Sequence, residues 1–140
     1  MNRSQIIESG STTIILDAYN ANPSSMQLSL KSFIELDSSK QKVLILGDMN
    51  ELGEDAVKMH QEILECFKYL SFKSVFLIGK YFAQADSDKQ YKCFDSCELC
   101  IEYLDQNPNF TFDNTISLIK ASRSLKLEEI SDYILAKSKP

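Results

Sequence analysis

The sequence lacks basic clusters and long apolar runs. Its 15 Lys and Arg residues are outnumbered by 20 Asp and Glu, for a formal net charge of −5. Without a basic stripe we expect neither a nucleic-acid nor an anionic-membrane surface. No apolar run approaches the roughly 20 residues that cross a bilayer, and the polar opening 1–5 has no hydrophobic stretch behind it, unlike a signal peptide. These absences predict a soluble, cytoplasmic protein whose partners are small molecules or proteins.

Histidine is nearly absent, which limits the metal and nucleophile chemistry that the chain can offer. His60 is the only one, and the four cysteines are Cys66, Cys93, Cys97 and Cys100. The last two have C-x-x-C spacing, but a tetrahedral zinc site needs four ligands and no second pair matches them. The aromatic and proline neighbours of a thioredoxin-like motif are also missing. We expect no metal site, buried structural thiols on a helix, and a structural role for His60, since no catalytic triad can be assembled from it.

The chain does have the length and apolar content of one domain spanning residues 1–140, with 44% hydrophobic and 25% charged residues. Short β-branched runs alternate with segments of helical periodicity. This alternation predicts an α/β fold: a doubly wound, mostly parallel sheet of five to six strands with helices on both faces. Asn22-Pro23 and Asp95-Ser96 mark helix starts. The expected strands are Thr12–Leu16, Lys42–Leu46, Ser74–Ile78, Tyr91–Phe94 and Thr115–Ile119, and the expected helices cover Met26–Ile34, Val57–Phe67, Leu99–Leu104 and Leu127–Ile134.

Polar residues gather where three of the expected strands end. The segments are Asp17–Pro23, Gly47–Gly53 and Lys120–Ser124. Folds of this class bind ligands beyond the carboxyl ends of their strands. A carboxylate there can accept hydrogen bonds from a ribose diol, and an arginine fork can hold a carboxylate. The glycine-bracketed segment is not a P-loop, because the lysine and hydroxyl of that motif are missing. Singly each segment reads equally well as a solvated turn, but together they predict a binding cleft.

Read together, four segments resemble one family in the correct order. They are Asn2-Arg3-Ser4-Gln5, Asp17-Ala18-Tyr19-Asn20-Ala21-Asn22-Pro23, Gly47-Asp48-Met49-Asn50-Glu51-Leu52-Gly53 and Lys120-Ala121-Ser122-Arg123. The resemblance is to the Mur ligases of peptidoglycan synthesis, of the type that adds D-alanyl-D-alanine to UDP-N-acetylmuramoyl-tripeptide through an acyl phosphate. It covers essentially the whole chain as that family's C-terminal domain, which closes over ATP and delivers the incoming dipeptide.

The resemblance also implies roles for individual residues. Arg3, Asp17, Asn20 and Asn22 would contact the nucleotide, with Asp17 holding the ribose. The D-alanyl-D-alanine pocket would be formed by Tyr19, Asp48, Met49, Glu51, Lys120, Ser122 and Arg123. In this family Mg²⁺ is bound mainly by the central domain, which is missing here, so no complete catalytic set is expected and the isolated domain should be inactive. Where the family usually has Lys-Gly-Ser-Arg this chain has Ala121, and a positive φ there would be mildly strained.

Two other interpretations stay open at this stage. One is another ligase of the same superfamily, of the folylpolyglutamate or cyanophycin type. The other is a nonenzymatic, receiver-like signalling module, in which Asp17, Asp48 and Lys120 would imitate a phosphoacceptor cluster. The amide-rich segment after Asp17 suits a receiver poorly.

Overall fold

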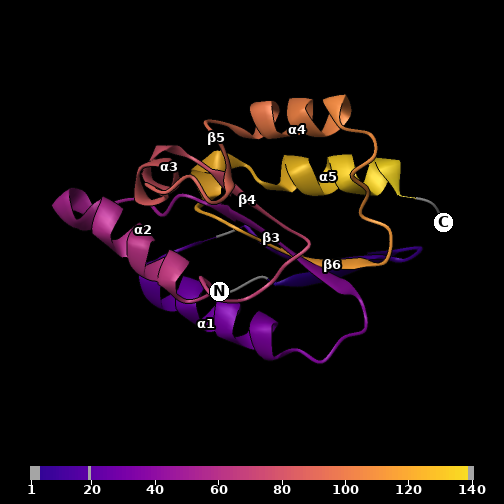
Figure 1. Ribbon diagram of the computed structural model, residues 1–140, viewed down its shortest axis with the longest axis horizontal. Helices are drawn as coiled ribbons and strands as arrows, with labels where there is room; N and C mark the ends of the chain where they lie inside the picture. Colours follow the sequence, from indigo (N-terminus) through magenta and orange to yellow (C-terminus); the bar gives the residue numbers. More distant parts are fainter. Residues whose placement is uncertain (1–3, 19, 139–140) are drawn as a thin grey trace.

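The computed structural model describes residues 4–18 and 20–138. Its strands and helices alternate along almost the whole chain, as expected (Figure 1). Short 3-10 turns at Gly53–Asp55 and Arg123–Leu125 precede the second and last helices. The elements in chain order are β1 (Gln5–Ser9), β2 (Thr12–Asp17), α1 (Pro23–Glu35), β3 (Gln41–Gly47), α2 (Ala56–Glu65), β4 (Ser74–Ile78), α3 (Lys80–Ala85), β5 (Lys92–Phe94), α4 (Cys97–Gln106), β6 (Thr115–Lys120) and α5 (Glu128–Lys137).

The strands form one sheet in the order β1-β2-β6-β3-β4-β5. Every neighbouring pair is parallel except β1 and β2, which form an antiparallel hairpin at one edge. β6 therefore lies between β2 and β3, although it comes last in the sequence. Its register sets Asp17 directly beside Lys120. The ends of β2, β6 and β3, with the polar segments that follow them, thus meet at one edge of the sheet.

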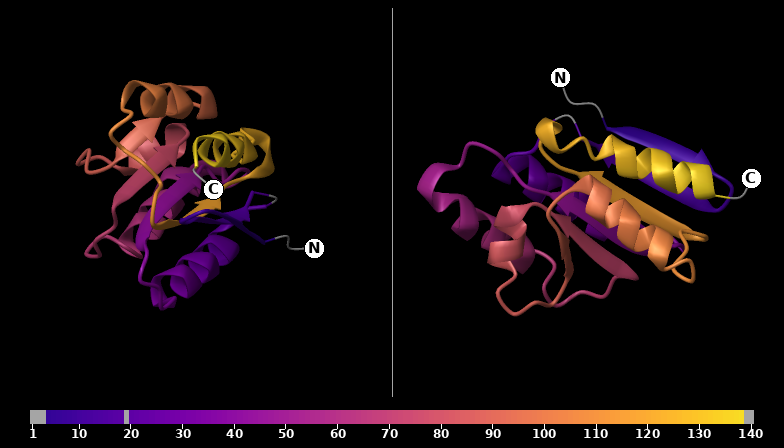
Figure 2. Two further views of the ribbon diagram at one scale, coloured as in Figure 1. Left: turned by 90° about the vertical axis from the view of Figure 1, so that its right-hand side faces the viewer. Right: turned by 90° about the horizontal axis from the view of Figure 1, so that it is seen from above.

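The helices lie on the two faces of the sheet (Figures 1 and 2). A layer of buried apolar side chains holds the helices on each face. Buried residues of α1, α2 and α3 pack on one face with Leu44 and Leu46, while those of α4 and α5 pack on the other with Val43 and Ile45. Because successive side chains of a strand point to opposite faces, a continuous apolar run such as that of β3 serves both layers. The doubly wound α/β expectation is confirmed.

The helix starts follow the sequence signals. Asn22 caps α1, with its side chain accepting from the Ser25 N–H, and Pro23 stands at the first helical position. Ser96 caps α4 in the same way. In the described part of the chain, no helix is long and apolar enough to cross a membrane.

The sequence did not predict β1 and α3. β1 is a short edge strand whose residues are exposed or half-buried, so it has no buried apolar run to mark it. α3 has six residues, and Gly79 precedes it with no side-chain cap. Both elements matter to the site, because β1 protects the edge of β2 and α3 binds the end of β3.

Candidate functional site

A cleft of about 640 Å³ opens at the carboxyl ends of the central strands. Three loops line it, one following each of β2, β3 and β6. Asn20, Ala21 and Asn22 come from the first, Asn50, Glu51 and Leu52 from the second, and Ser122, Arg123 and Ser124 from the third. The predicted meeting of three polar loops at one edge of the sheet is therefore present in the structure.

A buried ion pair forms the base of the first loop. The Lys120 ammonium lies 2.7 Å from Asp17 Oδ2, and both side chains are almost fully buried. The same ammonium donates to the carbonyl oxygen of Asn20 at 3.2 Å. Ser29 of α1 adds a weaker hydrogen bond to Asp17 Oδ2 at 3.5 Å. Lys120 thus ties the end of β2 and the start of its loop to β6, since one cation satisfies both acceptors.

Asp17 also borders a second opening, a groove of about 290 Å³ between β2 and α1. The groove is lined mainly by aliphatic and hydroxyl side chains, namely Ser4, Ile15, Leu28, Ser29, Ser32, Phe33, Leu36 and Leu118. The hydrogen bonds from Ser29 and Lys120 both reach Oδ2 of the Asp17 carboxylate.

The second loop is held through Asp48, whose carboxylate turns toward α3. One oxygen accepts from the Tyr81 N–H and the other from the Phe82 N–H, both at 2.9 Å. These N–H groups belong to the first turn of α3, which has no side-chain cap of its own. Gly79 makes room for this arrangement: its φ is +117°, and a Cβ there would lie 2.3 Å from the Asp48 carboxyl carbon.

The second and third loops are joined to each other across the cleft. The Ser122 N–H donates to the Asp48 carbonyl oxygen at 3.2 Å, and the Asn50 amide donates to the Ser124 hydroxyl at 2.8 Å. Glu51, between them, is exposed and has a φ of 63°, which is uncommon for a residue with a side chain. The rim of the cleft is therefore a pair of turns joined by hydrogen bonds.

His60 supports the second loop from below. It is fully buried in α2, with its Nε2 2.9 Å from the Met49 backbone nitrogen and its Nδ1 2.6 Å from the Ala56 carbonyl oxygen. Burial lowers its pKa below 6.5, against smaller opposing effects of the Ala56 carbonyl and the Asp48 carboxylate. The ring faces the loop rather than the sheet.

The structure divides the predicted site residues into two groups. Asn20, Asn22, Glu51, Ser122 and Arg123 line the cleft. A second group is buried and supports the loops from beneath: Asp17, Asp48, Met49 and Lys120. Whether either group binds substrate stays a prediction.

Arg3 and Tyr19 lie outside the described residues. Sequence reasoning did not single out Asn50 or Ser124, and the only signal for them was their place in the two polar loops. The expected strain at position 121 is absent, since Ala121 is not among the described residues with positive φ. It packs against Gly47, where a Cβ would come within 2.5 Å of the Ala121 methyl.

The thiols fit a structural reading. Cys97 and Cys100 are buried on α4, and burial is the main cause that raises each pKa to about 12. The Cys97 thiol donates to the Leu125 carbonyl oxygen at 3.0 Å. Among residues 4–18 and 20–138, no three His, Cys, Asp or Glu side chains gather as a metal site.

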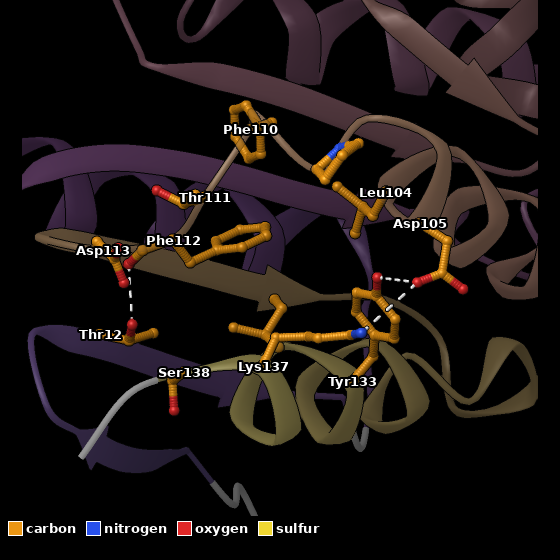
Figure 3. Close-up of a pocket in the computed structure, with 12 residues that line it drawn as sticks. Thr12, Leu104, Asp105, Phe110, Thr111, Phe112, Asp113, Tyr133, Lys137 and Ser138 are labelled. Atoms are coloured by element: carbon orange, nitrogen blue, oxygen red, sulfur yellow. Dashed lines mark hydrogen bonds and ion pairs between the residues drawn. The ribbon is translucent and has the colours of Figure 1, made fainter.

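A different cavity of about 330 Å³ opens at the far end of the sheet, between α4, α5 and the loop that enters β6 (Figure 3). Several of its polar side chains are engaged: the Tyr133 hydroxyl donates to Asp105, and the Lys137 ammonium lies 4.0 Å from the same carboxylate. The Thr12 hydroxyl donates to the Phe112 carbonyl oxygen. The three cleft loops lie at the opposite strand ends, so this cavity belongs to another part of the surface.

The sheet order defines an α/β domain of the open-sheet class, in which ligands bind at the edge of the sheet where this cleft lies. Within that class, residues 2–138 match the domain described as "Mur ligase, glutamate ligase domain". The chain therefore belongs to the Mur ligase family.

Three curated relatives carry the name UDP-N-acetylmuramoyl-tripeptide–D-alanyl-D-alanine ligase. The protein of Rickettsia prowazekii is 30% identical over 135 residues, which cover 94% of this chain and 29% of the relative. That of Buchnera aphidicola subsp. Baizongia pistaciae is 35% identical over 139 residues, which cover 96% of this chain and 29% of the relative. That of Bacillus subtilis is 32% identical over 126 residues, which cover 84% of this chain and 27% of the relative. This chain thus spans less than a third of their length.

Solved structures show the same fold. A crystal structure of MurF from Acinetobacter baumannii superposes with a TM-score of 0.81 at 22% identity, covering 96% of this chain and 30% of that one. MurF from Thermotoga maritima in complex with ADP gives 0.75 at 23% identity, with the same coverage. A folylpolyglutamate synthase from Thermotoga maritima superposes with a TM-score of only 0.55, covering 98% of this chain and 31% of that one. The fold is thus closer to the two MurF structures than to the folylpolyglutamate synthase.

The receiver-like interpretation is disfavoured as well. The Asp17 carboxylate is paired with Lys120, whereas the Asp48 carboxylate binds the first turn of α3. The two acids therefore serve different elements instead of sharing one phosphoacceptor site.

Proposed function

We propose that this chain is the C-terminal domain of an ATP-dependent ligase that adds D-alanyl-D-alanine to UDP-N-acetylmuramoyl-tripeptide in peptidoglycan synthesis. The observation that carries the proposal is the cleft in which the loops after β2, β3 and β6 meet. The names of the relatives support the substrate, and the loops that line the cleft contain the motifs that resemble the family. A cytoplasmic location stays a prediction of the sequence.

The nucleotide fits the residues around Asp17. An adenosine needs an apolar wall for the base and an acceptor for the ribose diol, and the groove beside α1 offers Ile15, Phe33 and Leu118 together with the carboxylate of Asp17. Asn20 and Asn22 on the neighbouring loop would face the phosphate side. Mg²⁺ does not fit the described residues, because they contain no cluster of ligands. We therefore expect its ligands to come from the rest of the parent protein.

The carboxylate of D-alanyl-D-alanine calls for a cation, and two were predicted. Lys120 is 1% exposed and already bonded to Asp17 and Asn20. Arg123 is exposed and lines the cleft. Because a guanidinium can hold a carboxylate through two parallel hydrogen bonds, we assign the dipeptide contact to Arg123. Lys120 instead holds the first loop in place.

Bound ATP supplies the phosphoryl group that activates the tripeptide carboxyl. This chain would contribute orientation and enclosure. The hydrogen-bonded loops would hold the dipeptide amine beside the activated carboxyl and exclude water, which competes with the amine for that carboxyl. Alone, the chain lacks the phosphate and metal contacts of the parent enzyme. We therefore propose that it binds nucleotide weakly and does not ligate by itself.

The test is a reconstituted ligation. The chain is mixed with a separately expressed N-terminal and central domain pair, magnesium-ATP, the UDP-linked tripeptide and D-alanyl-D-alanine, and phosphate release is followed. Arg123→Ala should raise the KM for the dipeptide roughly tenfold or more, as loss of a charged hydrogen bond does. Asp17→Asn should raise the KM for ATP.

The matched control is Lys31→Ala, an exposed cation on α1 outside the cleft, which should leave both constants unchanged. No phosphate release with folded components, and no NMR shifts on adding ATP or dipeptide, would refute the ligase proposal.

A further inference from the structure

The loop after β3 is fixed by three successive backbone contacts, each to a different element. The Asp48 N–H donates to the Ile78 carbonyl oxygen at 3.0 Å, and the Asp48 carbonyl oxygen accepts from the Ser122 N–H at 3.2 Å. The next group, the Met49 N–H, donates to the His60 imidazole at 2.9 Å. The first two contacts are backbone to backbone and independent of side-chain identity. The third depends on the residue at position 60.

The two hydrogen bonds of His60 define its protonation state. A carbonyl oxygen only accepts, so the contact with Ala56 at 2.6 Å requires a proton on Nδ1. A backbone N–H only donates, so the contact with Met49 requires a bare Nε2. The imidazole is therefore neutral and in one tautomer. It is fully buried, with its ring edge-on to Phe82 at 4.6 Å.

Within the described part of the chain, the titratable residues in contact with the imidazole from neighbouring elements are Asp48 and Tyr81. Asp48, at the end of β3, has Oδ1 3.7 Å from Nε2, and Tyr81, on α3, has its ring 5.4 Å away. The Asp48 oxygens already accept from the first turn of α3. A proton on Nε2 would point at the Met49 N–H, so it would break the bond that holds the loop.

We propose that His60 is a positioning residue of the proposed ligase: its neutral imidazole fixes Met49, and through it the turn that presents Asn50 and Glu51 to the cleft. Met49 is fully buried, so its backbone is the pivot between the core and the exposed turn. From there Asn50 reaches the Ser124 hydroxyl. The role in ligation rests on the proposed function, whereas the fixation of the loop does not.

Two substitutions separate the two bonds of the ring. In His60→Gln the side-chain oxygen lies near the place of Nε2 and can still accept from Met49. In His60→Asn the shorter amide lies near the place of Nδ1 and can still donate to Ala56, but it cannot reach Met49. A positioning role predicts that glutamine preserves the loop and asparagine does not, whereas a purely space-filling role predicts that both behave alike.

The first measurement is amide hydrogen exchange of the 140-residue chain at pH 7, followed by NMR. Exchange of the Met49 amide should be faster by about tenfold or more in His60→Asn, as loss of one buried hydrogen bond implies, and near wild type in His60→Gln. Equal exchange in the two variants would overturn the proposal. So would a wild-type imidazole that carries its proton on Nε2, or on both nitrogens, in a long-range ¹H–¹⁵N spectrum.

The second measurement is the reconstituted ligation. His60→Asn should raise the KM for the dipeptide more than it lowers kcat, and His60→Gln should restore the KM. If the wild-type mixture is active and His60→Asn leaves the KM for the dipeptide unchanged, the positioning role is overturned. If the wild-type mixture is itself inactive while the exchange result holds, the proposed ligase function has failed, and the fixation of the loop by His60 has not.

Discussion

Replacing Lys120 by methionine should destabilise the fold strongly, because it leaves the Asp17 carboxylate buried without its cation. Asp17 is 3% exposed, and among the described residues its other hydrogen bond comes from the Ser29 hydroxyl at 3.5 Å. Removing one partner of a buried ion pair costs about 3–5 kcal/mol. We therefore expect the free energy of unfolding to fall by about 3–5 kcal/mol.

Urea unfolding followed by circular dichroism measures this loss. The double variant Asp17→Leu/Lys120→Met should recover most of the loss, since a buried pair replaced by apolar residues is often neutral. An exposed control, Lys31→Met, should change stability by less than about 0.5 kcal/mol. A Lys120→Met protein within about 1 kcal/mol of wild type, or a double variant no better than the single one, would refute the reasoning.

Three further predictions concern the surroundings of the site. Gly79→Ala should lower the free energy of unfolding by about 2–4 kcal/mol, because its Cβ would meet a buried carboxylate at a φ of +117°. Gly53→Ala should lower it by only about 1 kcal/mol, because Gly53 has a φ of +62° and nothing lies within 4 Å of its Cβ position. Equal losses in urea unfolding would contradict this prediction. Because the pKa of His60 is lowered in the folded state, the unfolded chain binds the proton at a higher pH than the folded chain does, and the free energy of unfolding should fall as the pH drops below 6.5. His60→Gln should make the free energy of unfolding depend less on pH between pH 7 and 5.5. Cys66, which is exposed, should be alkylated in the native protein at pH 8 well before Cys97, whose pKa is raised to about 12; mass mapping that finds the reverse order would contradict the burial.

The sequence predicted the parts of the fold that bury apolar residues on both faces. The strand Ser74–Ile78 was predicted with the bounds that it has, and the other four strands differ by a residue or two at their ends. Long buried runs are readable because a parallel strand covered by helices has no polar face. The edge strand β1 and the short helix α3 were missed because each depends on a neighbour: β1 on its hairpin with β2, and α3 on the Asp48 carboxylate.

The site was predictable as three loops at one edge but not as individual roles. The polar residue types marked the loops, yet sequence could not tell that Asp17 and Lys120, 103 positions apart, bind each other. That pairing follows from the register between β2 and β6, which only the assembled sheet defines. The same applies to His60, whose partner is a backbone N–H and leaves no trace in the residue types.

The place of β6 in the sheet has a consequence for how the protein is made. β2 and β3 do not pair with each other; each pairs with β6, which a ribosome delivers only after β3, β4, β5 and the helices between them have been synthesised. Until then both strands have an unpaired inner edge, and unpaired edges are where nascent chains aggregate. The Asp17–Lys120 contact can likewise form only at that late stage. The cleft therefore cannot form before the central strand pairs with its two neighbours.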